Sequence, residues 1–143
     1  MLSDLRYAKK MDGSKAFTIC GDPLYFAPEI VAQQGYDYGA DLWALGTLLF
    51  EMFEGSAPLG TSETDEMQLF KKISSFEPDS LVYTEKTSKK ARSLVSALLE
   101  PNVHRRCGYK SALEVCVCVC VCVCVCVCVC VCVCVCVDVF HNQ

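Results

Sequence analysis

Hydrophobic residues recur at helical spacing in three stretches of the chain, and these stretches predict its main elements. Residues 41–54 are apolar on almost every face, which is typical of a helix buried in the middle of a domain. Residues 61–75 predict an amphipathic helix with acidic residues near its start and lysines further on, as the helix dipole favours. In residues 88–100 the apolar positions fall at i, i+3, i+4, i+7 and i+8, and Pro101 ends the pattern.

These patterns also predict which side chains form the core. In the central helix one stripe comprises Leu42, Leu45, Leu49, Met52 and Phe53, flanked by Trp43, Leu48 and Phe50. In the second helix the inward side chains are Met67, Phe70 and Ile73, and a variant capping box pairs Ser62 with Asp65. In the third they are Ala91, Leu94, Val95, Leu98 and Leu99.

The remaining sequence predicts loops and two shorter helical pieces. Residues 1–26 show no clear period and predict a loop, within which Asp12-Gly13 could close a small hairpin. Residues 25–31 predict a short helix with Pro28 in its first turn. A last helix is expected to begin at Ser111, with Glu114 as its capping partner. The fold class is therefore mainly α, with a long leading loop.

A change in composition divides the chain. Residues 115–137 are an unbroken alternation of valine and cysteine that holds 11 of the 13 cysteines. We therefore divide the sequence into a domain at 1–114, a low-complexity Val-Cys repeat at 115–137 and a tail at 138–143. The first part is long enough for one small domain.

Charge and cysteine content narrow the function classes. The net charge of −4 gives no basic excess for a nucleic-acid partner. Outside the repeat only Cys20 and Cys107 remain, too few for a disulfide framework, which is typical of an intracellular protein. Charged residues within the first ten positions leave no apolar stretch for a secretion signal. We expect a cytoplasmic location, unless residues 115–137 span a membrane.

Three separate motifs together point to one family. They are Thr-Ile-Cys-Gly-Asp-Pro-Leu-Tyr-Phe-Ala-Pro-Glu at 18–29, Gly-Tyr-Asp-Tyr-Gly-Ala-Asp-Leu-Trp-Ala-Leu-Gly at 35–46, and Pro-Asn-Val-His-Arg-Arg-Cys-Gly at 101–108. Residues 2–114 thus resemble the C-terminal lobe of eukaryotic Ser/Thr protein kinases of the cyclic-nucleotide-dependent type. The resemblance is closest to the kinase module of plant proteins that join protein phosphatase 2C, cyclic-nucleotide-binding and kinase domains. It implies a truncated, mainly α kinase lobe with its activation segment.

The resemblance assigns regulatory and metal positions near the start of the chain. Asp4 lies where the family has the magnesium-binding aspartate of Asp-Phe-Gly, although here Leu5 and Arg6 follow it. Thr18 matches the phosphorylated threonine of the activation loop, which implies a phosphoprotein, and Lys9 matches a residue that pairs with that phosphate.

The same resemblance assigns the loop that seats the substrate peptide. Its residues here are Gly21, Asp22, Pro23, Leu24 and Tyr25. The family usually has threonine where this chain has Asp22, and glutamate where it has Leu24. The carboxylate of Asp22 would raise the electrostatic cost near the reaction centre, and therefore either alter substrate choice or abolish activity.

Four further residues are assigned structural roles. Glu29 and Arg106 resemble the buried ion pair that ties the activation segment to the helical base, and breaking such a pair typically costs ~3–5 kcal/mol. Asp41, at the start of the central helix, matches the aspartate that holds the catalytic-loop backbone, and Trp43 belongs to the same motif. Without the family, Glu29 and Asp41 would be interpreted as helix caps.

Several parts that phosphoryl transfer requires do not occur in these 143 residues: a Gly-x-Gly-x-x-Gly loop, a Val-Ala-x-Lys lysine and a His-Arg-Asp motif. The family uses Mg-ATP, but we expect this chain alone to bind it poorly and to be inactive. The family's partners are protein substrates or other kinases, with cyclic-nucleotide-binding domains in the parent protein. The alternative is a pseudokinase-like interaction module that docks partners through residues 61–75.

The Val-Cys repeat admits four interpretations. Its 23 residues could form a single membrane-spanning helix, although no basic cluster or aromatic belt flanks them. A β-strand of this length would far exceed the usual ~3–10 residues. Alternate cysteines could bind zinc or copper(I) as thiolates. A TG-dinucleotide repeat also encodes Val-Cys in every sense frame, so a gene-model artefact or low-complexity segment is the interpretation that we favour.

Overall fold

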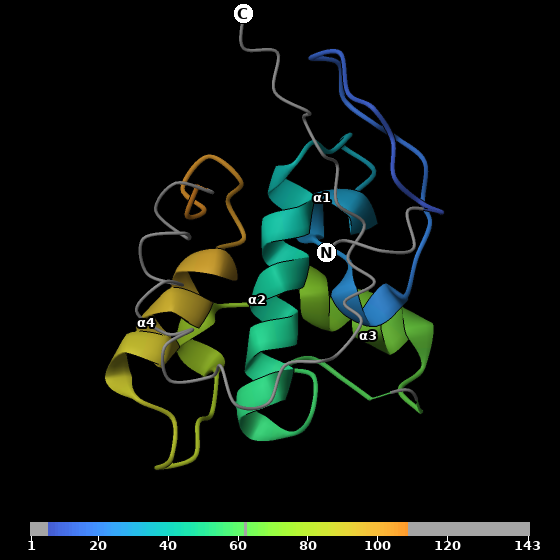
Figure 1. Cartoon of the computed structure of the whole chain (residues 1–143). Helices are drawn as coiled ribbons and strands as arrows, with labels where there is room; N and C mark the ends of the chain where they lie inside the picture. Colours follow the sequence, from blue (N-terminus) through green and yellow to red (C-terminus); the bar gives the residue numbers. More distant parts are fainter. Residues whose placement is uncertain (1–5, 62, 109–143) are drawn as a thin grey trace, which may run out of the picture.

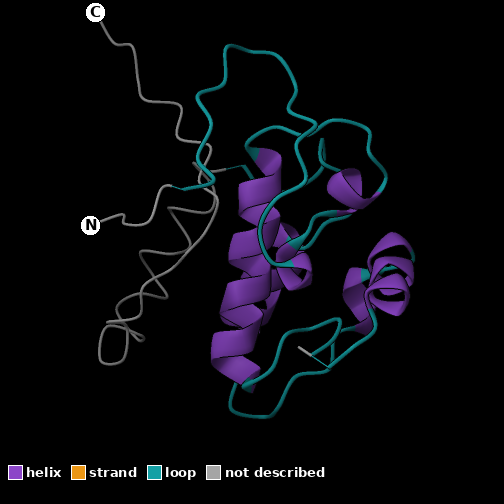
Figure 2. Ribbon diagram, turned by 90° about the vertical axis from the view of Figure 1, so that its right-hand side faces the viewer, coloured by secondary structure: helices purple, strands orange, loops and turns teal. Residues whose placement is uncertain are grey.

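The computed structural model describes residues 6–61 and 63–108, and this part of the chain is mainly helical (Figure 1). The elements are, in order, a 3-10 turn η1 (Pro23–Tyr25), α1 (Pro28–Val31), α2 (Gly39–Glu54), α3 (Glu66–Ser74), a second 3-10 turn η2 (Pro78–Ser80) and α4 (Lys89–Leu98). Figure 2 shows these helices joined by loops, with no strand in the described ranges. The expected mainly α class is confirmed. Several predictions lie outside the described residues: Asp4, the cap Ser62, the helix expected from Ser111, the whole Val-Cys repeat and the tail at 138–143.

The central helix α2 lies between α4 on one side and α1 and α3 on the other (Figure 1). It begins where the Asp37 carboxylate accepts a hydrogen bond from the Gly39 amide (2.8 Å), and it ends at Gly55, whose φ of +83° is the left-handed conformation that glycine allows. Helix α2 therefore forms the axis on which the other helices pack.

The buried face of α2 differs from the expected stripe. Trp43, Thr47 and Phe50 are buried, whereas Met52 is 41% exposed. Leucines of the expected stripe are half-buried and pack instead against Leu94 and Leu98 of α4. A helix that is apolar on nearly every face gives little directional information, so the large rings rather than the leucine period decided which side faces the main cluster.

Helix α4 agrees with its sequence pattern. Ser88 caps it by accepting a hydrogen bond from the amide of Ala91 (3.2 Å). The five predicted core positions are all buried, at Ala91, Leu94, Val95, Leu98 and Leu99. Helix α4 packs closely on α2 at Gly46. A Cβ added there would lie only 2.9 Å from the Cβ of Leu98. Glycine at this position permits the close approach of the two helices.

Helix α3 begins later than the sequence predicts. Its N-cap is Asp65, which accepts a hydrogen bond from the Gln68 amide (3.2 Å), and Thr64 and Thr61 are hydrogen-bonded to each other before it. Leu69 and Ile73 are buried, whereas Met67 is 63% exposed, so the prediction that Met67 faces inward is wrong. Leu69 and Ile73 are four positions apart and therefore share one face of α3, beside which the predicted Phe70 is half-buried.

The leading segment does not form the hairpin that Asp12-Gly13 suggested. Instead Asp12 accepts hydrogen bonds from the amide and hydroxyl of Ser14, and Ala16 pairs with Tyr36 across an isolated antiparallel bridge. A polar side chain that bonds two residues ahead makes a turn without any strand pairing. The helix expected over 25–31 is split into η1 and α1.

Within residues 6–61 and 63–108, no helix has both the length and the apolar character needed to cross a membrane.

Candidate functional site

Glu29 and Arg106 form a buried, two-pronged ion pair although 77 positions separate them. Nη1 of Arg106 lies 2.7 Å from Oε1 of Glu29, and Nη2 lies 3.0 Å from Oε2. The side chains are only 1% and 9% exposed, for Arg106 and Glu29 respectively. A planar guanidinium matches a carboxylate in this geometry, which lysine cannot reproduce. The structure therefore brings together the two residues that the sequence proposed as partners.

The remaining N–H groups of Arg106 also have acceptors. All three acceptors are backbone carbonyls: Nη1 donates to Gly39 (2.8 Å), Nε to Glu100 (2.9 Å) and Nη2 to Pro101 (3.4 Å). Together with the bonds to Glu29, these occupy all five donors that a guanidinium has. Full pairing matters because a buried charge with an unmet donor is strongly destabilising. Arg106 thus joins α1, the first residue of α2 and the segment after α4.

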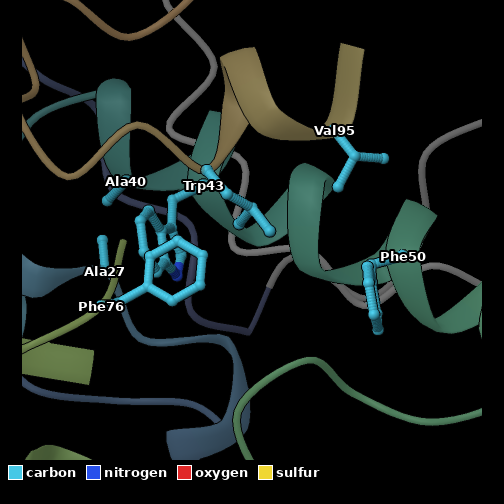
Figure 3. Close-up of a cluster of buried hydrophobic side chains, with 7 residues drawn as sticks. Ala27, Ala40, Trp43, Phe50, Phe76 and Val95 are labelled. Atoms are coloured by element: carbon cyan, nitrogen blue, oxygen red, sulfur yellow. The ribbon is translucent and has the colours of Figure 1, made fainter. Parts of the chain in front are cut away.

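The indole of Trp43 lies beneath this junction. The guanidinium carbon of Arg106 is 5.3 Å from the ring centroid, a cation–π distance. On another side the ring meets Phe76 edge-on, with centroids 5.5 Å apart. Figure 3 shows Trp43 and Phe76 together with Ala27 and Ala40. The ion pair therefore rests on the main hydrophobic cluster.

The predicted substrate loop, residues 21–25, is shaped by its own backbone. Gly21 has a φ of +101°, which favours glycine. Asp22 caps η1 by accepting from the Leu24 amide (3.0 Å), and Leu24 packs against the cluster of Phe26, Leu69 and Ile73. The carboxylate of Asp22 is thus a local cap at the surface, and the apolar Leu24 stabilises the loop by packing on α3.

Tyr25 connects this loop to α2, a contact that the sequence analysis missed. Its hydroxyl donates to Oε2 of Glu51 at 2.7 Å. Burial, followed by the bond to Glu51, raises the pKa of Tyr25 to about 12. The motif alone gives no sign of this bond, because the partner lies 26 positions away on the helix.

We expect this pKa to be visible in the pH dependence of stability. A pKa that folding raises from 10.0 to about 12 contributes stability below pH 10 that is lost as the pH rises toward 12. The wild type should therefore lose free energy of unfolding over that interval relative to Tyr25→Phe, measured by urea denaturation at stepped pH. Tyr38→Phe, which alters a 55% exposed ring, is the matched control and should follow the wild type. A constant difference between wild type and Tyr25→Phe would contradict the assignment.

The other predicted residues lie on the leading segment and at the start of α2. Thr18 and Lys9 are exposed on the leading segment, and Asp41 is half-buried in the first turn of α2. The Thr18 carbonyl accepts a hydrogen bond from the Tyr36 hydroxyl, which the sequence analysis also missed. Cys20 and Cys107 are half-buried.

Two acidic side chains in this region, those of Asp22 and Glu29, form bonds within the protein. Asp22 accepts from a backbone amide and Glu29 from Arg106, so these two carboxylates are already engaged. Over 6–61 and 63–108, no three side chains of the metal-ligating types gather at one point. What the described part does is hold the loop at residues 21–25 in a fixed position on a helical base.

Comparison with known proteins identifies the family of the chain. The family described as "Protein kinase domain" matches residues 1–116. The chain is 36% identical over 110 residues to "cGMP-dependent protein kinase, isozyme 2 forms cD5/T2" of Drosophila melanogaster, covering 76% of this chain and 12% of that protein. It is 38% identical over 112 residues to "Serine/threonine-protein kinase apg-1" of Neurospora crassa, covering 76% and 11%. The chain thus spans about a tenth of the length of the curated relatives that it matches. With its helical architecture and its Glu29–Arg106 junction, the chain belongs to the protein kinase domain family.

Proposed function

We propose that residues 6–108 supply the activation segment and the peptide-docking base of a serine/threonine protein kinase. One observation carries this proposal: the fully paired Arg106 fastens the end of the activation segment, at Glu29, to the helical base. A protein substrate would be positioned by residues 21–25, whose loop is held by Leu24 against α3 and by Tyr25 against α2. Positioning of this kind is a large part of how kinases accelerate phosphoryl transfer.

We further propose roles for the residues around this base. In an assembled domain Asp4 would take the magnesium position, Thr18 would accept a regulatory phosphate with Lys9 as its cation, and Asp41 would hold the backbone of the catalytic loop. Trp43 would support the ion pair from below. The match to a cGMP-dependent kinase suggests that cyclic-nucleotide-binding domains accompany this module in the parent protein.

The phosphate donor would be Mg-ATP, and these 143 residues should not transfer phosphate on their own. The glycine-rich loop, its lysine and the catalytic aspartate do not occur in the sequence. Asp22 adds a second effect, since a carboxylate where the family has threonine repels the negative charges of the reaction centre. We therefore expect an assembled domain with Asp22 to be slower than one with threonine there.

A chimaera tests the proposal. Residues 6–108 replace the corresponding segment of the Drosophila cGMP-dependent kinase domain, and phosphate transfer from Mg-ATP to a serine peptide is measured. The chimaera should be active, Asp22→Thr should raise its rate, and the isolated chain should show no transfer. Circular dichroism and thermal unfolding confirm that each protein is folded.

Two outcomes would contradict the proposal. Phosphate transfer by the isolated chain would overturn the expected dependence on the missing parts. A folded chimaera that stays inactive even as Asp22→Thr would favour the pseudokinase-like alternative, a module that binds partners without catalysis. Arg105→Ala, at an exposed position beside the junction, is the matched control and should leave the rate of the chimaera unchanged.

A further inference from the structure

The backbone around Thr18 is fastened to the loop between α1 and α2. The Ala16 amide donates to the Tyr36 carbonyl (2.8 Å), and the Tyr36 amide donates to the Ala16 carbonyl (2.9 Å). The Tyr36 hydroxyl donates to the carbonyl of Thr18. These three bonds hold the chain on both sides of residue 17, and each of them uses a backbone atom of the activation segment.

Packing reinforces this attachment. The ring of Phe17 lies directly over Gly35, where a Cβ would come within 2.7 Å of a ring carbon. Gly35 has a φ of +73°, so both its conformation and its lack of a side chain permit the contact. Ala16 is 1% exposed. The ring of Tyr36 packs against the main hydrophobic cluster, so the attachment point is itself fixed to the core.

We propose that Tyr36 is a positioning residue that seats Thr18 before any phosphate is added. The Tyr36 bond reaches the Thr18 carbonyl, and the Thr18 side chain remains at the surface. A phosphate on the Thr18 hydroxyl would therefore add charge at this surface without being needed to order residues 16–18. The inference rests on the proposed function in one respect: that residues 6–29 serve as an activation segment.

Amide hydrogen exchange of the full 143-residue chain, measured residue by residue by NMR in reducing buffer, tests the inference. In the unphosphorylated wild type the amides of Ala16 and Tyr36 should be protected. Tyr36→Phe should speed exchange at these two positions about 5-fold, which corresponds to the loss of one ordinary hydrogen bond. The amides in the middle of α2 and α4 should be unchanged, whereas general destabilisation would speed exchange there as well.

Tyr38→Phe is the matched control, since it removes a hydroxyl from an exposed ring two residues away and should leave both amides unchanged. Thr18→Ala should also leave them unchanged, because the bond uses the carbonyl rather than the side chain. The inference is overturned if the two amides are unprotected in the wild type and become protected when phosphothreonine is incorporated at position 18. Equal exchange in wild type and Tyr36→Phe would also overturn it. These readouts need no catalysis, so they are separate from success or failure of the chimaera.

Discussion

Arg106→Ala is expected to lower the free energy of unfolding by ~3–5 kcal/mol, a large share of the ~5–15 kcal/mol that a domain possesses. The substitution leaves the Glu29 carboxylate buried without its partner, and it leaves the carbonyls of Gly39 and Glu100 without their donor. Urea denaturation followed by circular dichroism measures the loss. Arg106→Lys should recover only part of it, because one ammonium cannot donate in all these directions.

Two further variants isolate the pair itself. Arg105→Ala changes an exposed arginine one position earlier and should shift stability by no more than about 0.5 kcal/mol. Glu29→Ala combined with Arg106→Ala should cost clearly less than the sum of the single substitutions, because the double variant leaves neither charge buried alone. Additive losses would mean that the two groups do not depend on each other, contrary to the geometry.

The sequence allowed prediction of those features that rest on local periodicity or on a distinctive motif. In α4 the apolar positions follow one helical stripe beside a serine cap, and all five predicted core residues are buried. Glu29 and Arg106 could be paired only because each belongs to a recognisable motif, since nothing local relates positions 77 apart.

The errors came where local patterns were ambiguous. Helix α3 was expected to begin at residue 61, because the polar residues at 61–64 suit a helix N-terminus as well as Asp65 does. The structure shows that Asp65 is the cap. Met67 is exposed and Leu69 is buried, so the face of α3 that meets the core also differs from the predicted one. In α2 nearly every face is apolar, so the period could not show that Trp43 and Phe50, rather than Met52, face the core.

The contacts that no local pattern encodes were missed altogether. Tyr25 bonds to Glu51, and Tyr36 bonds to the Thr18 carbonyl, through single tyrosine hydroxyls that reach across the fold. A tyrosine in a loop is equally compatible with exposure or burial, and its partner depends on tertiary packing. These two bonds nevertheless fix the loop at residues 21–25 and the backbone at Thr18, so these details of the candidate site required the structure.

Trp43→Ala is the second substitution with a large expected effect, ~3–5 kcal/mol of lost unfolding free energy. Trp43 is fully buried, and its ring contacts both Phe76 and the guanidinium of Arg106. Removing the ring leaves a cavity beneath the ion pair and removes the cation–π contact. Thermal unfolding and urea denaturation should both report the loss.

Trp43→Phe should cost much less than Trp43→Ala. Within the described ranges Nε1 of Trp43 has no hydrogen-bond partner, so a phenyl ring loses volume but breaks no hydrogen bond. Phenylalanine also keeps an aromatic face for Arg106 and an edge contact for Phe76. Tyr38→Ala, which truncates an exposed ring just before α2, is the control for loss of an aromatic side chain and should change stability little. Equal losses for Trp43→Phe and Trp43→Ala would show that an aromatic ring at this position supports the junction no better than a methyl group, and would contradict this account of the core.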